Sequence, residues 1–92
     1  MQEEVLAFIC EEINKRLKDV KDVKFKVEYQ WGNTGHVRII HGLQSKGTMY
    51  FNFQSDYCTL GEKTGWYCEE NFTEWVKDQV KLFLIECSYS QP

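Results

Sequence analysis

The chain has almost no proline, no long hydrophobic run and glycine in only one region. Its single proline is the last of 92 residues, and all six glycines lie between residues 32 and 65. No apolar stretch approaches the roughly 20 residues of a membrane-spanning helix. The acidic start, residues 1–4, lacks the basic region of a secretory signal. We therefore expect one cytoplasmic domain over residues 1–92, with a frayed polar tail at residues 88–92 and no membrane partner.

Motifs for catalysis, metal binding and phosphate binding are also missing. The sequence contains no CxxC pair, no G-x-S-x-G elbow and no glycine-rich phosphate loop. The two histidines, His36 and His41, lie near opposite ends of one predicted strand, and their odd separation points them to opposite faces. We therefore expect no enzyme, no cofactor and no metal site.

The four cysteines permit several interpretations. Cys10 and Cys87 fall on apolar helical faces, where a buried thiol behaves as a small hydrophobic group. In a reducing cytosol all four are expected as free thiols. Cys58 and Cys68 lie across a glycine-containing loop, so a cross-strand disulfide, a shared metal edge and a minor cysteine-dependent enzyme stay open as alternatives for this pair.

Negative charge exceeds positive charge, and the two signs are unevenly distributed. The net charge is −3, with −4 in residues 1–14, +4 in residues 15–26 and −4 in residues 53–92. A net acidic domain is a poor general nucleic-acid binder, because affinity comes mostly from cations that displace phosphate counterions. Direct nucleic-acid binding is not expected. The basic run of residues 15–26 is typical of a solvated helix end, and a local anion contact there stays open.

Apolar periodicity predicts a helix near each end of the chain. Apolar residues recur at helical spacing over residues 3–20, and acid-first pairs such as Glu12–Arg16 support that helix. A second helix is predicted over residues 71–87, where Asn71 is the expected N-cap and Glu74 completes a capping box.

Between the helices the apolar period changes to two, which predicts strands. The predicted strands cover residues 23–31, 36–41, 48–54 and 57–60, with a brief pairing at 66–68. The predicted loops cover residues 32–35, 42–47 and 61–65. The expected fold class is α+β: an antiparallel meander of three to four strands flanked by N- and C-terminal helices in two layers, both helices on its apolar face.

The element order resembles that of the double-stranded RNA-binding domain, which is also αβββα. That family places lysines at the start of its last helix, where they contact phosphates. The same place here carries Glu69, Glu70 and Glu74, and carboxylates repel phosphate. The resemblance covers element order alone and does not imply RNA binding.

Aromatic residues alternate with carboxylates in the segment 56–75. Aromatic side chains supply contact area at interfaces, and carboxylates steer the approach of a cationic partner. The candidate partner-binding residues are Glu62, Trp66, Tyr67, Glu69, Glu70 and Glu74. The competing interpretation is that the aromatic residues pack over the sheet edge and the acids form a solvated helix start.

The leading hypothesis is a non-catalytic protein-binding module: a small acidic inhibitor that blocks a nucleic-acid-handling enzyme by occupying its basic surface. Bacterial immunity proteins and phage-encoded anti-defence proteins such as anti-CRISPRs are similar in size and acidic charge. The alternative is a small-ligand or nucleotide-binding domain that uses an exposed sheet face around His36, Arg38 and Tyr50.

The predicted C-terminal helix carries a second apolar stripe, formed by Trp75, Leu82 and Ile85. Either the first helix covers these residues or they form a surface for self-association or a partner. A two-fold dimer would pair the stripe with its own copy, so a monomer and a homodimer are both compatible with the sequence.

Overall fold

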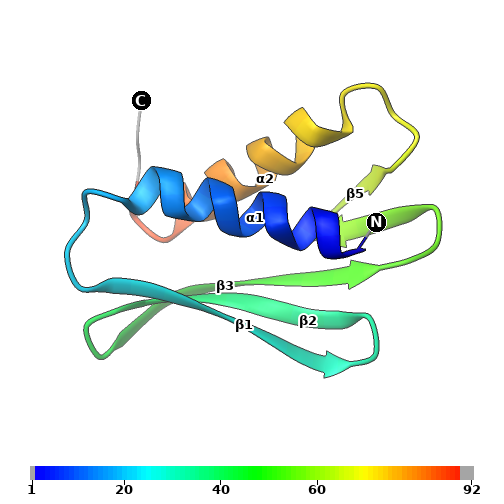
Figure 1. The fold of residues 1–92 in the computed structure, drawn as a ribbon. Coiled ribbons are helices and arrows are strands. Elements are labelled where there is room, and N and C mark those ends of the chain that lie inside the picture. Colours follow the sequence, from blue (N-terminus) through cyan, green and yellow to red (C-terminus); the bar gives the residue numbers. More distant parts are fainter. Residues whose placement is uncertain (1, 90–92) are drawn as a thin grey trace.

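Two helices lie on one face of a five-stranded antiparallel sheet in the computed structural model of this chain, which describes residues 2–89 (Figure 1). The elements in chain order are α1 (Gln2–Leu17), β1 (Val23–Trp31), β2 (Thr34–His41), β3 (Gln44–Phe53), β4 (Tyr57–Leu60), β5 (Lys63–Trp66) and α2 (Phe72–Glu86). Each strand pairs with the next along the chain, so the sheet is an open meander. The predicted α+β class and helix–meander–helix layout are confirmed.

Helix α1 is shorter than predicted and ends at Leu17. The Val20 amide donates to the Leu17 carbonyl at 3.0 Å in a turn, and Asp22 then adopts a φ of 62°. This left-handed conformation cannot continue a right-handed helix, and it turns the chain into β1. Within α1, Glu12 is buried, and its Oε2 accepts a hydrogen bond of 2.7 Å from Arg16 Nε, which compensates the buried carboxylate.

Helix α2 begins after Asn71 as predicted, but the predicted capping box is absent. The Asn71 side chain caps no backbone amide, and its backbone φ of −100° and ψ of 22° lie outside the extended region that a capping side chain needs. The Asn71 carbonyl instead accepts from the Trp75 amide at 2.9 Å. Glu74 points toward Lys77, with 3.8 Å between Oε1 and Nζ.

The C-terminal end of α2 closes with a Schellman motif. The Ser88 amide donates to the Ile85 carbonyl at 2.9 Å, and the Tyr89 amide donates to the Leu84 carbonyl at 2.8 Å. Ser88 has a φ of 73°, the left-handed conformation that this motif requires. The prediction of a frayed tail from residue 88 is therefore wrong for Ser88 and Tyr89, while residues 90–92 lie outside the described part of the chain.

Two predicted loops are in fact tight turns, which adds a fifth strand to the sheet. The chain reverses at Gly42–Leu43 and at Gly61–Glu62, and both turn glycines have a φ of 64°. Residues 44–47 therefore belong to β3, and residues 63–65 belong to β5.

Two glycines that suggested loops lie inside strands, where Trp75 of α2 and Cys87, directly after α2, approach them closely. A β-carbon on Gly47 would lie 2.6 Å from the Cys87 sulfur, and one on Gly65 would lie 2.4 Å from the Trp75 ring. Both distances are shorter than any normal contact, so only glycine fits beneath the helix at these positions.

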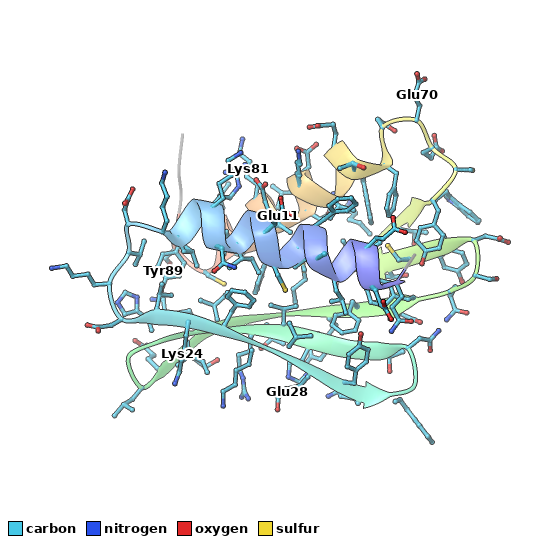
Figure 2. All side chains as sticks on the ribbon, in the orientation of Figure 1. Glu11, Lys24, Glu28, Glu70, Lys81 and Tyr89 are labelled. Atoms are coloured by element: carbon cyan, nitrogen blue, oxygen red, sulfur yellow. The ribbon has the colours of Figure 1, made fainter. Side chains whose placement is uncertain are left out.

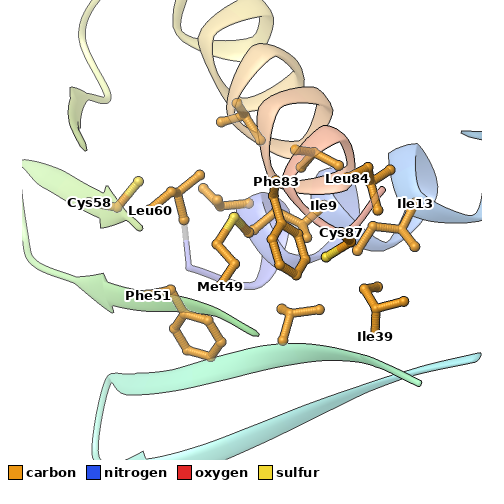
Figure 3. Packing of buried hydrophobic residues seen from close by; sticks show 14 of the residues in the cluster. Ile9, Ile13, Ile39, Met49, Phe51, Cys58, Leu60, Phe83, Leu84 and Cys87 are labelled. Carbon is orange, nitrogen blue, oxygen red and sulfur yellow. The ribbon is translucent and has the colours of Figure 1, made fainter. Parts of the chain in front are cut away.

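The hydrophobic core lies between the two helices and the inner face of the sheet (Figure 3). Helices α1 and α2 and strands β2, β3 and β4 contribute the buried aliphatic, aromatic and thiol side chains of this core. The buried apolar residues are Val5, Ile9, Ile13, Leu17, Val37, Ile39, Met49, Phe51, Phe53, Cys58, Leu60, Phe72, Val76, Val80, Phe83, Leu84 and Cys87. The opposite face of the sheet carries no helix and is open to solvent (Figure 1).

Candidate functional site

An exposed tryptophan marks the end of β5. Trp66 remains 47% exposed, and its ring lies against the ring of Tyr57, its cross-strand partner on β4, with 4.9 Å between the centroids. Side chains alternate along a strand, and the neighbouring Gly65 faces α2, so Trp66 and Tyr57 lie on the open face of the sheet. Contact with Tyr57 holds the Trp66 ring in a defined orientation.

The loop between β5 and α2 carries carboxylates that project into solvent. Glu69 and Glu70 are exposed, and neither forms an ion pair with any described residue. Glu70 stands at the far end of the loop and points away from the body of the molecule (Figure 2). Glu74, in the first turn of α2, is also exposed.

Tyr67 anchors this loop instead of facing a partner. Its ring packs edge-on against Phe72 at 5.4 Å between centroids, and its amide donates to the Asp56 carbonyl at 3.1 Å. Burial raises the pKa of the Tyr67 hydroxyl, and the nearby Cys58 thiol adds to the increase. Two further backbone bonds, from the Glu69 amide to the Trp66 carbonyl and from the Phe72 amide to the Glu69 carbonyl, complete the turns of the loop.

The structure therefore brings together part of the predicted partner-binding set. Trp66, Glu69 and Glu70 are exposed within one short stretch, and Glu74 follows directly in α2. Glu62 lies in the β4–β5 turn, at the opposite end of β5 from Trp66. We call Trp66, Glu69, Glu70 and Glu74 the acidic loop surface.

The residues of the alternative ligand face also meet, on the open side of the sheet. Oε1 of Glu28 accepts a hydrogen bond of 2.9 Å from Arg38 Nη2 and lies 3.0 Å from Nε2 of His36. The hydrogen bond with His36 is the main cause that holds the pKa of Glu28 below its ordinary value, and Arg38 contributes. The Tyr50 ring lies edge-on to His36 at 5.6 Å.

The second histidine lies on the helix side of the sheet, opposite His36 as predicted. Nδ1 of His41 is 2.6 Å from the Tyr89 hydroxyl, and the two rings stack with 5.9 Å between centroids. Lys46 lies over the same Tyr89 ring at 6.0 Å. No sequence pattern predicts this contact, because Tyr89 falls in a polar stretch that resembles a frayed end.

All four cysteines are free thiols, and the two that might have paired occupy different environments. Cys58 is fully buried, and burial raises its pKa to about 11, which leaves little reactive thiolate near neutral pH. Cys68 is exposed, and Cys10 is half-buried. Among residues 2–89, no three His, Cys, Asp or Glu side chains gather in an arrangement that could hold a metal ion.

The second apolar stripe of α2 is divided in the structure. Trp75 lies over Gly65 and stacks on Phe72 at 5.7 Å, so β5 and α2 itself cover it. Helix α1 packs beside α2 but leaves Leu82 51% and Ile85 40% exposed, so of the two alternatives the one in which the first helix covers the stripe does not hold for these two residues. Leu82 borders a groove of about 400 Å³ between α2 and the sheet, which the sequence did not predict.

In the part of the chain that the structure describes, neither helix has the length and apolar character needed to cross a bilayer. Comparisons with protein-family models, with curated proteins and with solved structures gave no match to this chain.

Proposed function

We propose that this protein is a non-catalytic protein-binding module that acts through the acidic loop surface. The observation that carries the proposal is an exposed, oriented Trp66 followed in the adjoining loop by two exposed carboxylates, Glu69 and Glu70, that have no counter-ion among residues 2–89. A tryptophan of this kind supplies binding area, and unpaired carboxylates attract a cationic partner and accelerate the encounter.

The acidic loop surface is also held in place before any partner arrives. Tyr67 packs into the molecule between Trp66 and Glu69, and backbone hydrogen bonds tie both ends of the loop. A surface that is already ordered loses less conformational entropy on binding than a flexible loop does.

The partner that fits this surface is a protein with an exposed basic patch. Enzymes that handle nucleic acids carry such patches, because they must bind phosphates. A small acidic domain that occupies the patch would act as an inhibitor in the cytoplasm, in the manner of immunity proteins or phage anti-defence proteins such as anti-CRISPRs, to which this chain is similar in size and charge.

Charge reversal at the acidic loop surface tests the proposal. Glu69→Lys, Glu70→Lys and Glu74→Lys are combined in one variant, and Glu3→Lys, Glu4→Lys and Glu11→Lys form a matched control with the same change in net charge on exposed positions of α1. Each protein is used to capture partners from host lysate, and the affinity for each identified partner is then measured at low and high salt. We expect the loop variant to bind on the order of tenfold or more weakly, with a smaller salt dependence.

The control variant should keep wild-type binding, and both variants should keep the wild-type circular dichroism spectrum. Equal loss of binding in the two variants would mean that only total charge matters. Wild-type affinity in the loop variant would place the interface elsewhere on the molecule.

A second candidate function uses the open sheet face. Lys24, Lys26 and Arg38 make this region locally positive against one acid, Glu28, and Tyr50 offers an exposed ring beside them. A cationic surface with an exposed aromatic ring suits a small anionic ligand such as a nucleotide, whose base stacks while its phosphate meets the cations.

Titration with adenosine monophosphate tests this second candidate. Amide resonances of β2 and β3 should shift with wild-type protein and stop shifting with Tyr50→Ala, while Trp31→Ala, at an exposed aromatic of β1, should behave as wild type. Shifts that persist in Tyr50→Ala, or no shifts at all with the wild type, would exclude nucleotide binding at this face.

A further inference from the structure

Strand β1 forms an outer edge of the sheet, and among residues 2–89 its only strand neighbour is β2. The Gly42 amide bonds across to the Asp22 carbonyl at 2.7 Å, in the same register as the β1–β2 ladder. Every second residue from Asp22 onward therefore turns its backbone groups toward β2. The residues between them point their amides and carbonyls away from the sheet: Val23, Phe25, Val27 and Tyr29.

The same four residues carry apolar side chains that the helices cover incompletely. Val23, Phe25 and Val27 pack against the core but are only partly buried. The Tyr29 ring lies edge-on to Phe51 at 5.5 Å between centroids and remains 49% exposed. A long unpaired edge flanked by apolar side chains is a template for a further strand.

Helix α1 runs along this edge and carries opposite charges at its two ends. The side-chain amide of the first α1 residue donates to the Tyr29 hydroxyl at 3.1 Å, and the hollow at this end of β1 is lined by Tyr29, Glu3 and Glu4. The hollow at the other end lies beside Phe25 and is lined by Lys18, which directly follows α1. None of these three charged side chains forms an ion pair with a described residue.

We propose that two copies of this chain pair through their free β1 edges in a two-fold symmetric dimer, so that their sheets become continuous. In an antiparallel pairing with the two-fold axis at Val27, Phe25 of one copy lies opposite Tyr29 of the other, and the outward backbone groups of these residues bond to one another. The paired segment ends at Tyr29, before the irregularity between Tyr29 and Trp31. One operation therefore satisfies the open backbone groups and brings the exposed Tyr29 ring beside Phe25 of the other copy.

The charges on the open face of the sheet select this register. The axis at Val27 places Lys26 directly opposite Glu28 of the other copy, and symmetry repeats the pair. Oε1 of Glu28 contacts Arg38 and His36, whereas its Oε2 has no partner among residues 2–89 and can accept from Lys26. Opposite charges in this position stabilise a strand pair and like charges destabilise it.

Other registers lack this match. A shift of two residues would place either two copies of Lys26 or two copies of Glu28 opposite one another. A shift of one residue would set the outward groups of one strand against groups that already bond to β2. Lysines on an edge strand usually discourage pairing, but with the axis at Val27 each Lys26 faces a carboxylate.

The helix side of the edge is complementary to itself about the same axis. Because Phe25 lies opposite Tyr29 of the other copy, the hollow that carries Lys18 faces the hollow that carries Glu3 and Glu4. One β1 edge thus supplies both halves of the charge pattern, which favours a second copy of this chain over an unrelated strand. The acidic loop surface lies at the opposite edge of the sheet, beyond β5, and stays free in both copies.

Sedimentation equilibrium of the full chain tests the dimer. We expect the wild type to be dimeric, and Lys26→Glu to dimerise at least about tenfold more weakly, because its carboxylate would face Glu28 of the other copy at both symmetric pairs. Position 26 lies opposite Arg38 of its own chain, so a glutamate there is compatible with the monomer fold. Lys63→Glu is the matched control: it makes the same charge change at an exposed lysine of β5, the other edge strand, and should leave the association constant unchanged.

Both variants should keep the wild-type circular dichroism spectrum. A wild type that is monomeric at millimolar concentration would overturn the proposal. A Lys26→Glu variant with the wild-type association constant would overturn it as well.

Amide hydrogen exchange tests which edge is paired. The amides of Phe25 and Val27 should be protected in the dimer and should lose this protection on dilution or with Lys26→Glu. The Trp66 amide is the internal control: the next residue bonds back to β4, so the Trp66 amide points away from the sheet and should exchange rapidly at every concentration. A dimer in which Phe25 and Val27 exchange as rapidly as Trp66 would have its contact on another surface, and this result would contradict the proposed pairing.

Discussion

Cys58 illustrates how far one side chain can depart from its ordinary chemistry when the core encloses it. Its thiol is fully buried among apolar neighbours, and this burial alone raises its pKa to about 11 from an ordinary 9.0. The thiol of the unfolded chain is exposed to water and ionises at the ordinary value. Cys58 therefore links the stability of the fold to alkaline pH.

The sign of this linkage follows from the protons that each state holds. Between the two pKa values the unfolded chain has lost the Cys58 proton and the folded chain retains it, so the free energy of unfolding must fall as pH rises from 9.0 toward about 11. We expect Cys58 to lower the free energy of unfolding by up to about 2–3 kcal/mol over this pH range. Urea unfolding of the wild type and of Cys58→Val between pH 9 and about pH 11 measures this decrease. The valine variant should lose less stability with pH, and parallel curves would contradict the assignment.

At the scale of elements, the sequence predicted that helix α2 forms, but it did not predict the hydrogen bonds that begin and end it. Apolar spacing gave its length to within one residue at each end. The predicted capping box is absent because the Asn71 backbone is not extended, and its side chain therefore caps no backbone amide. The Schellman motif could not be predicted from the sequence, because the residue with the left-handed backbone is Ser88, whereas the usual sequence signal for this motif is a glycine.

This left-handed serine predicts a stabilising substitution. A residue with a β-carbon is strained at a φ of 73°, by roughly 1–2 kcal/mol relative to right-handed conformations, and glycine removes the strain at a cost of about 0.5–1 kcal/mol in entropy. Ser88→Gly should therefore raise the free energy of unfolding by several tenths to about 1 kcal/mol in urea titrations. Ser55→Gly, at an exposed loop position without a positive φ, is the control and should not stabilise the protein. A decrease in stability with Ser88→Gly would show that the serine side chain matters more than its backbone.

At the scale of the whole molecule, the sequence predicted the two layers of helices and sheet, but it did not predict where strands β3 and β5 begin. Alternation over residues 23–31 and helical spacing at both ends sufficed for the α+β arrangement, because each pattern reports burial on one face. Gly47 and Gly65 were misread as loop residues, since a glycine required by a neighbouring helix has the same sequence signal as one required by a turn. The part of β3 that pairs with β4 depends on how far β4 extends, and no local pattern encodes the difference in strand length.

Strand alternation and the extent of β5 also decide which of the predicted site residues lie together in the structure. His36, Arg38 and Tyr50 met as predicted because strand alternation places them on one face. Trp75 separated from Leu82 and Ile85 because β5, which was not predicted over residues 63–65, provides the surface that covers it. Tyr67 turned inward because it follows the end of that strand.

The contact between α1 and α2 has a consequence for how the chain matures during translation. Strands β1 to β4 each find a partner in the next strand to emerge from the ribosome, so the meander can assemble progressively. Helix α1 emerges first, yet the helix against which it packs is the last element of the fold. Until α2 has emerged, Val5, Ile9 and Ile13 can pack only against the sheet and lack the α2 side chains that complete their burial. Nascent chains that lack α2 are therefore the species most in need of chaperone protection.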